Sequence, residues 1–248
     1  MATLLVMLPF CSEGAPKKDQ KDANKEKNSE INSSNPENSQ SVTGKVGKYL
    51  YVDLGLPSGL KWATYNVWAT KPEEYGDYFA WGETTPQPDS DTSYSWATYK
   101  WCNGNFDSMT KYCSQSRYGT VDSLTTLLPE DDAATANWGS AWRMPTWAEL
   151  DEMIEGCNWE RTKDYNGTGV SGQIGASKTN GNTIFLPAAG GRNNGSLSDV
   201  RGYGYYWSSS LRTGSSFSAY VLYFNSGYID WDFDNRLYGL SVRAVSGK

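Results

Sequence analysis

The sequence predicts a folded domain that combines helices with strands, and three observations support this mixed fold class. Short segments with alternating apolar side chains, which are typical of strands, occur near the start of the domain. Two helix-start signals, at Pro129 and Thr146, follow them along the chain. The last quarter returns to segments typical of strands, separated by turn residues, and no internal repeat is visible.

Residues 1–11 form a predicted leader. Residues 4–10 are apolar, and this run stops at Cys11, before a polar segment. The pattern resembles the end of a bacterial lipoprotein signal in which Cys11 is the lipidated residue. No Lys or Arg precedes the run, and Phe10 stands where such signals usually have a small residue, so a generic secretory leader is the alternative. The expected location is the cell outer membrane, as a surface-exposed lipoprotein, or outside the cell as a secreted protein.

Residues 12–47 have the composition of a disordered tether. They contain no aromatic residue, and six Lys balance six Asp or Glu. Such a segment cannot bury enough apolar surface to offset the loss of chain entropy on folding. The folded domain is therefore expected to span residues 48–248.

Residues 48–248 carry the whole net charge of −6 and 34 of the 35 aromatic residues, which is ample material for one core. The negative charge argues against binding to nucleic acid, which requires a basic face. No stretch after the N-terminus is long and apolar enough to span a bilayer, so a lipid anchor is the only expected contact with a membrane.

The absence of His from the sequence excludes several kinds of active site. Ser-His-Asp and Cys-His nucleophile pairs, His general bases and His-containing zinc sites all need this side chain. A Gly-rich phosphate loop followed by Lys is also missing. We therefore expect a protein that is not an enzyme and needs no cofactor.

The first half of the domain is predicted to contain strands and one long loop. Residues 49–53 and 60–66 are expected to be strands separated by a Gly- and Pro-containing turn. Residues 77–82 are expected to form a further strand. Residues 83–125 are rich in Asp, Ser, Tyr and Thr with little periodicity, which favours a long ordered loop.

Two helices are predicted in the middle of the chain. The first spans residues 130–138, after Pro129 and with three acidic residues in its first turn. The second spans residues 146–156, where Thr146 is the expected N-cap and Glu149 completes a capping box. The residues expected on the buried face of this helix are Trp147, Leu150, Ile154 and Cys157.

The remaining segments are predicted strands at residues 183–190, 205–210, 219–225, 228–233 and 240–245. Within the third of these, Tyr220, Leu222 and Phe224 are expected on one face, and Val221, Tyr223 and Asn225 on the other.

The composition of residues 193–247 differs from that of the preceding chain. These 55 residues contain no Lys, Glu, Gln, Met, Pro or Cys, whereas the first 192 residues contain 35 Lys, Glu, Gln and Met. Twelve aromatic residues stand here among Ser, Gly, Asp, Asn and Arg. Rigid aromatic side chains among small polar ones are typical of a recognition surface. An ordinary antiparallel β region is the alternative, although its wet face would normally carry Lys and Glu.

Several motifs along the domain resemble one known family. In chain order they are YVDLGLPSGLKWA, YGDYFAWGET, PEDDAA, NWG, WRMPT, FLPAAG, YYWSSS and GLSVRAV. Over about residues 49–245 they resemble the Fibrobacter succinogenes major paralogous domain family, which is abundant in gut Bacteroidetes. The resemblance implies an α+β, C-type-lectin-like fold like that of formylglycine-generating enzymes, in which the strands at 49–53 and 240–245 pair. Those enzymes need reactive thiols in their C-terminal half, and here no Cys follows Cys157.

Some members of this family resemble the variable proteins of diversity-generating retroelements. In those systems mutated Asn codons become NNY codons, which cannot encode Lys, Glu, Gln, Met or Trp. The first four types are missing after residue 192, and Trp207 and Trp231 would belong to the fixed scaffold. The resemblance thus implies a ligand-binding protein with a variable C-terminal surface.

The candidate binding surface lies within residues 211–240, where aromatic side chains would supply contact area and polar ones hydrogen bonds. The twelve candidate residues are Arg212, Ser215, Phe217, Val221, Tyr223, Tyr228, Asp230, Asp232, Phe233, Asp234, Asn235 and Tyr238. The expected partner is an unknown protein or glycan at the cell surface. A glycan-binding adhesin module, with or without Ca²⁺, is the main alternative, and a structural envelope protein is a third.

The sequence also contains a candidate calcium site and a candidate disulfide. Asp230, Asp232 and Asp234 alternate along a strand and offer oxygen ligands of the kind that Ca²⁺ accepts, although a solvated acidic face is the favoured interpretation. Cys102 and Cys113 could close a short loop in an oxidising compartment. Arg243 is expected to belong to the scaffold, paired with an acid such as Asp53.

Overall fold

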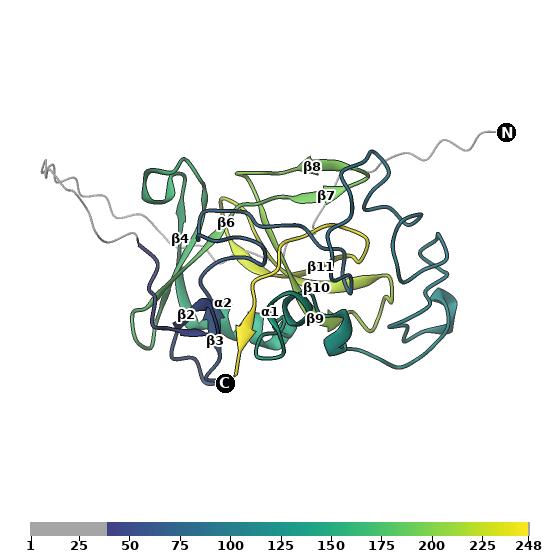
Figure 1. The fold of residues 1–248 in the computed structure, drawn as a ribbon, viewed down its shortest axis with the longest axis horizontal. Helices are drawn as coiled ribbons and strands as arrows, with labels where there is room; N and C mark the ends of the chain where they lie inside the picture. Colours follow the sequence, from purple (N-terminus) through teal and green to yellow (C-terminus); the bar gives the residue numbers. More distant parts are fainter. Residues whose placement is uncertain (1–38, 248) are drawn as a thin grey trace, which may run out of the picture. The chain divides into compact units, whose positions relative to one another are not determined.

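The computed structural model describes residues 39–247, so the leader, Cys11 and most of the tether lie outside the described residues. Within this range the chain forms an α+β domain with two α-helices and small antiparallel sheets, as expected (Figure 1). None of the helices in this range is long and apolar enough to cross a membrane.

The first sheet joins the two ends of the domain in the strand order β1-β2-β3-β12. Two expectations need correction here. The fold begins earlier than residue 48, because β1 pairs with β2 and the Gln40 amide donates to the Thr64 carbonyl. The last strand also pairs with β3, through Val245 opposite Trp62, and not with β2. The strands are β1 (Gly44–Val46), β2 (Tyr49–Asp53), β3 (Lys61–Ala63) and β12 (Val245–Ser246).

The expected first helix is divided into a 3-10 turn (Pro129–Asp131) and α1 (Ala133–Trp138). The division falls at Asp132, whose extended backbone ends the turn and whose side chain accepts the Thr135 amide as the N-cap of α1. Trp138 of α1 stacks on Tyr49 of β2 with ring centroids 4.0 Å apart. This contact packs the helix against the first sheet.

The second helix, α2 (Trp147–Gly156), has the predicted capping box between Thr146 and Glu149. Its buried residues are Leu150, Met153 and Ile154. Trp147 was expected on this face but is 39 % exposed, because its ring lies against the half-exposed Tyr220 and the exposed Trp231 and not in the core. The helix ends at Cys157, which is buried as expected.

Two further small sheets follow α2. The first has the order β4-β5-β6 and the second is the β7-β8 hairpin. A close contact shapes the approach to this hairpin. Gly190 has a φ of +65°, and a Cβ on it would lie 2.0 Å from the Ser198 carbonyl oxygen, so no larger residue fits. The strands are β4 (Cys157–Thr162), β5 (Gly172–Ser177), β6 (Thr183–Pro187), β7 (Gly191–Asn193) and β8 (Ser196–Ser198).

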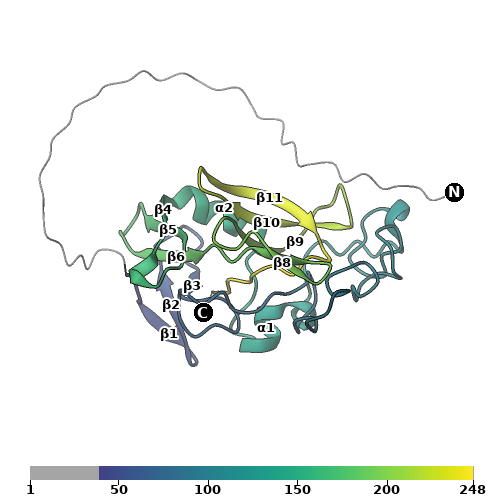
Figure 2. The same ribbon diagram turned by 90° about the horizontal axis from the view of Figure 1, so that it is seen from above.

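The segment of restricted composition, residues 193–247, contains all three strands of a sheet in the order β11-β10-β9 (Figure 2). Residues that face each other across antiparallel strands share one side of the sheet. Tyr206, Leu222 and Trp231 form one such row on the side that α2 covers, while Trp207, Val221 and Asp232 form a row on the other side. The strands are β9 (Gly204–Leu211), β10 (Ser218–Phe224) and β11 (Ile229–Asn235).

Residues 77–82 do not form the expected strand, and only an isolated bridge joins Phe79 to Leu240. Tryptophan side chains hold this segment against β9 instead. The Trp81 indole donates to the Ser208 carbonyl, and the Trp207 indole donates to the Phe79 carbonyl, each at 2.8 Å. Both indoles are fully buried. Side-chain hydrogen bonds thus replace part of a backbone ladder.

The long loop at 83–125 is held against the C-terminal part of the chain by Arg236, which is fully buried. Its guanidinium lies over the rings of Trp81, Tyr99 and Tyr112, with the nearest centroid 4.8 Å away. It donates to the Tyr99 hydroxyl and to the carbonyls of Lys111, Tyr112 and Ser216. One side chain therefore satisfies carbonyl groups in two distant segments.

The described thiols, Cys102, Cys113 and Cys157, are free, so the disulfide that could join Cys102 to Cys113 is not formed. Each of these two thiols is instead engaged locally. The Cys102 thiol donates to the Trp96 carbonyl, and the Cys113 thiol donates to the Gln115 carbonyl.

The expected ion pair between Arg243 and Asp53 is also wrong. Arg243 is buried and donates to the Asn66 side chain and the Ala63 carbonyl. Asp53 instead pairs with Lys61, its neighbour across β2 and β3.

We expect Arg236→Ala to lower the free energy of unfolding by about 3 kcal/mol or more, because it leaves several buried carbonyl groups without donors. Arg236→Lys should restore only part of this loss, since an ammonium cannot reproduce the planar donor set of the guanidinium. Urea unfolding measures both. Arg117→Ala is the matched control, because Arg117 lies in the same loop but is exposed. A loss no larger than that of the control would contradict the role given to Arg236.

Candidate functional site

The twelve predicted residues do not form one surface, and two of them are buried. Val221 is 1 % exposed and packs in the core beside Trp207. Ser215 is 6 % exposed. Phe217 packs edge-on against Trp96 and Tyr118 of the long loop. The prediction of ligand contact is therefore wrong for Val221 and Ser215, and Phe217 serves mainly to hold the loop.

Two other predicted residues lie together at β11, on the side of the sheet that α2 covers. The Arg212 guanidinium lies 3.3 Å from the centroid of the Phe233 ring. Further along the strand, Trp231 is 43 % exposed and contacts Trp147 at a centroid distance of 6.0 Å. Trp231, which was assigned to the fixed scaffold, is thus an exposed residue of this sheet.

Most of the remaining predicted residues lie on the opposite side of the sheet, which also carries a group of four tyrosines. We call Tyr203, Tyr205, Tyr223 and Tyr228 the tyrosine cluster. Successive rings contact one another, with centroids 6.3 Å apart for Tyr203 and Tyr205, 5.3 Å for Tyr205 and Tyr223, and 5.6 Å for Tyr223 and Tyr228. Tyr203 is 36 % exposed and Tyr228 52 % exposed. The cluster is thus a continuous aromatic surface open to solvent.

The strand register creates this surface. Tyr205, Tyr223 and Asp230 lie opposite one another across β9, β10 and β11, so their side chains share one side of the sheet. Tyr203 extends the row before β9, and Tyr228 reaches it from the turn before β11. The Asn225 amide donates to the Tyr223 hydroxyl and fixes that ring.

Three acidic residues on β11 form the rim of this side, and we call Asp230, Asp232 and Asp234 the edge aspartates. Because β11 is the outer strand of its sheet, every second amide on it faces away from β10. Each edge aspartate accepts the amide of the residue that follows it, at 2.7–2.8 Å. The carboxylates therefore satisfy the open edge and place negative charge there, which opposes pairing with another strand.

The edge aspartates do not form a calcium site. Side chains two residues apart on a strand are separated by about 7 Å, and each carboxylate here is directed to its own backbone amide. Among residues 39–247, no group of three His, Cys, Asp or Glu could hold a metal ion. In this arrangement the three carboxylates are not placed to share one ion.

Burial changes the acidity of the groups between the rim and the tyrosines. The pKa of Asp234 is raised to about 7, mainly because the carboxyl is desolvated by burial; the hydrogen bond from the Asn235 amide lowers this pKa, and the charge of Asp232 raises it. Desolvation also raises the pKa of Tyr205 well above its usual value, with added repulsion from Asp199 and Asp234. The Tyr205 hydroxyl thus stays protonated and donates to the Asp199 carboxylate.

Three residues of this surface were missed from sequence: Tyr203, Tyr205 and Asp199. The candidates were confined to residues 211–240, but the restricted composition starts at residue 193 and includes all three. Asp199 is exposed, and its carboxylate lies 3.4 Å from the Tyr205 hydroxyl. Asn235 and Tyr238, which were predicted, adjoin the edge aspartates and are joined by a 3.2 Å hydrogen bond.

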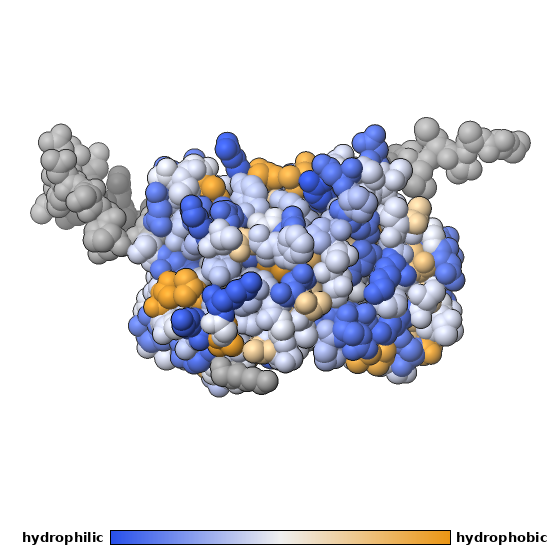
Figure 3. Space-filling view, viewed as in Figure 1, coloured by the Kyte–Doolittle hydropathy of each residue, from blue (hydrophilic) through white to orange (hydrophobic). Residues whose placement is uncertain are grey.

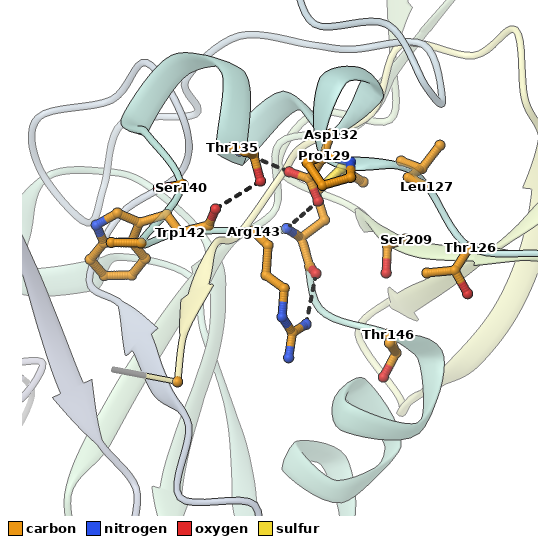
Figure 4. Close-up of a pocket in the computed structure, with 13 residues that line it drawn as sticks. Thr126, Leu127, Pro129, Asp132, Thr135, Ser140, Trp142, Arg143, Thr146 and Ser209 are labelled. Atoms are coloured by element: carbon orange, nitrogen blue, oxygen red, sulfur yellow. Dashed lines mark hydrogen bonds between the residues drawn. The ribbon is translucent and has the colours of Figure 1, made fainter.

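A separate pocket of about 490 Å³ lies between α1 and the start of α2 (Figure 4). Its polar side chains are occupied by the protein itself. Asp132 accepts the amides of Thr135 and Met144, and the Thr135 hydroxyl donates to the Trp142 carbonyl. Arg143 makes a two-point ion pair with Glu149. We therefore assign this pocket a structural role.

Elsewhere, the face of the domain in Figure 3 is mainly polar, with apolar side chains in small separate groups. Comparison with protein-family models, curated proteins and solved structures finds no match to this chain. The tyrosine cluster with its acidic rim is accordingly identified from geometry alone.

We expect Asp234→Asn to stabilise the protein above pH 7. The folded-state pKa of Asp234 is about 7, above its usual 3.8, so the folded state retains a proton that the unfolded chain has already lost. The contribution of the protonated Asp234 carboxyl to the free energy of unfolding is fully present below the pKa of the unfolded state. It is lost as the pH rises to the folded-state pKa of about 7. The advantage of Asp234→Asn should therefore grow from about pH 4 to pH 7 and then level off.

Urea unfolding between pH 5 and pH 8 measures this pH dependence. Asp230→Asn is the control, because Asp230 lies on the same strand but is exposed. An advantage of Asp234→Asn that does not change with pH, or that the control shares, would contradict the raised pKa.

Proposed function

We propose that this chain is a surface-tethered, non-enzymatic ligand-binding protein whose binding surface is the tyrosine cluster with its edge aspartates. One observation carries the proposal. The exposed tyrosines and the acids around them all come from residues 193–247, the segment with the restricted composition. A segment free to vary would be expected to contribute an exposed surface on a rigid support, and this sheet supplies one.

The scaffold we propose is C-type-lectin-like, within the paralogous-domain family that the sequence motifs resemble. Two features support it. Segments from both ends of the domain share one sheet, and the two helices lie between the first strands and the later sheets in chain order. The lack of His supports a binding role over hydrolytic or acyl-transfer chemistry.

We further propose that residues 193–247 are the target of a diversity-generating retroelement. The missing Lys, Glu, Gln and Met support this, because NNY codons encode none of them. Trp207 is fully buried and suits a fixed position, whereas Trp231 would be a fixed residue exposed beside the variable ones. The neighbouring DNA tests the proposal, since a near-identical repeat that differs only at adenines, next to a reverse transcriptase gene, is required.

A glycan is the second candidate ligand, as opposed to a protein. The arrangement of aromatic faces next to carboxylates favours it, because sugar rings stack on aromatic side chains while their hydroxyls donate to acids. Anchoring through Cys11 to the outer membrane would hold either ligand at the cell surface.

We expect Tyr223→Ala and Tyr228→Ala each to weaken ligand binding about tenfold or more, because central aromatic residues dominate interface energies. Purified protein is applied to arrays of saccharides and of mucosal and bacterial surface proteins, with calcium or with EDTA. Trp231→Ala is the matched control, since it removes a similarly exposed ring on the other side of the sheet. Binding that is lost in the control but kept in both tyrosine variants would reject the proposed surface. Loss of binding with EDTA would contradict the calcium-independent site described above.

A further inference from the structure

A basic pocket lies beside the tyrosine cluster, although the domain around it is acidic. The pocket has a volume of about 650 Å³ and is lined by three cationic residues, Arg161, Lys163 and Arg201. Tyr203 and Asn225 also line the pocket, and because Tyr203 belongs to the tyrosine cluster, the pocket adjoins that cluster. A volume of this size suits a small molecule or one or two sugar rings.

The three cations of this pocket have no acidic partner. Within residues 39–247, none of them takes part in an ion pair. The Arg161 guanidinium is half-buried and donates only to carbonyls, those of Arg201, Gly202 and Asn225. Lys163 and Arg201 are exposed. In a chain of net charge −6, three cationic residues that line one pocket and take part in no ion pair make an attractive site for an anion.

Hydrogen bonds from neighbouring strands fix the walls of the pocket before any ligand binds. Arg161 of β4 joins the turn before β9 to the turn before β11. The Ser171 hydroxyl donates to the Arg201 carbonyl at 2.6 Å, and the Gln173 amide donates to the Asn225 carbonyl at 3.2 Å. A ligand therefore meets a preformed site, which reduces the entropic cost of binding.

The backbone at Arg201 is in an unfavourable conformation. Its φ is +68°, and that of Asp199 is +64°, a region that residues other than glycine rarely adopt. Strain of this kind persists where the surrounding structure imposes it and is common at ligand sites. Here it turns the segment so that Arg201 lines the pocket while Tyr203 joins the aromatic surface.

We propose that the basic pocket binds the anionic group of an acidic saccharide, a carboxylated or sulfated sugar, whose rings lie on the tyrosine cluster. Three parts of such a ligand match three parts of the site. The anion meets the unpaired cations, the apolar face of a ring meets the tyrosines, and hydroxyl groups donate to Asp199 and the edge aspartates. An acidic peptide would satisfy the pocket, but its further carboxylates would be repelled by those same aspartates.

This inference rests on the proposed function, because it takes the tyrosine cluster as the ligand surface. The test uses NMR titration of the protein with methyl glucuronide, a sulfated monosaccharide, their uncharged counterparts and a glutamate oligomer. We expect the charged sugars to shift the amide signals of Gly202 and Gly227, which line the pocket, and the uncharged sugars to bind about tenfold more weakly or not at all. The carboxylated and sulfated probes identify which oxoanion is preferred.

The double variant Lys163→Gln, Arg201→Gln should weaken binding of the charged sugars about tenfold or more, since it removes two charge-assisted contacts. The matched control is Lys45→Gln, Lys178→Gln, which changes the net charge equally at exposed positions outside the pocket. Both double variants should unfold at the same urea concentration as the parent protein, because the four side chains are exposed.

The outcomes separate this inference from the proposed function. Equal binding of charged and uncharged sugars, no signal shift with any charged sugar, or an unaffected double variant overturns the inference. Equal or tighter binding of the glutamate oligomer overturns its saccharide part. If Tyr223→Ala abolishes saccharide binding while the double variant does not, the tyrosine surface stands without the pocket. If the reverse is observed, the pocket stands and the proposed function fails.

Discussion

The buried guanidinium of Arg236 is the interaction on which the side of the domain with the tyrosine cluster depends. It lies directly after β11, among three aromatic rings contributed by residues 81–112, and donates to carbonyls on both sides of the junction. A buried guanidinium whose N–H groups lack acceptors would greatly destabilise the folded state. The loop and the end of β11 therefore depend on each other for their stability. Asp131 adds to this junction by accepting the Tyr112 hydroxyl.

The β9–β11 sheet converts this anchoring into a surface. On the side of the sheet that carries the tyrosine cluster, each row ends at an aspartate of the outer strand β11. One such row begins at the buried Trp207 of β9 and continues through Val221 to Asp232. The inner end of each row is therefore fixed by packing, while its outer end is free to contact solvent or ligand. Tyr205 and Tyr223 form the next row on this side of the sheet. Their rings pack against the edge of the core and are only partly buried, so part of each ring faces solvent.

The sequence allowed the elements to be predicted better than their partners. Local signals sufficed for α2, whose N-cap depends on residues three apart, and for β10, whose alternation is regular. Contacts between distant segments were missed because no local pattern encodes them. The pairing of β12 with β3, the Trp81 and Trp207 hydrogen bonds and the caging of Arg236 all join residues more than 100 positions apart. The tyrosine cluster was predicted only in part for the same reason. Composition indicated the segment, but only the register of β9 with β10 brings Tyr205 to Tyr223.

This register also limits which positions of the segment can vary. A segment of restricted composition that supplied only surface would be expected to avoid the core, yet Trp207, Leu222 and Arg236 from this segment are fully buried. Alternate residues of one strand thus carry opposite requirements, and a change at a buried position alters the support of its exposed neighbours. Exposed positions such as Tyr228, Asp230 and Asp232 are not required for packing of the core and would be able to exchange one ligand contact for another. The basic pocket differs, because Arg161 and Lys163 precede the restricted segment while Arg201 and Tyr203 belong to it. The proposed ligand site would thus have a constant charge on one side and exchangeable contacts on the other. Such a site would retain its preference for an anion while the rest of the ligand changes.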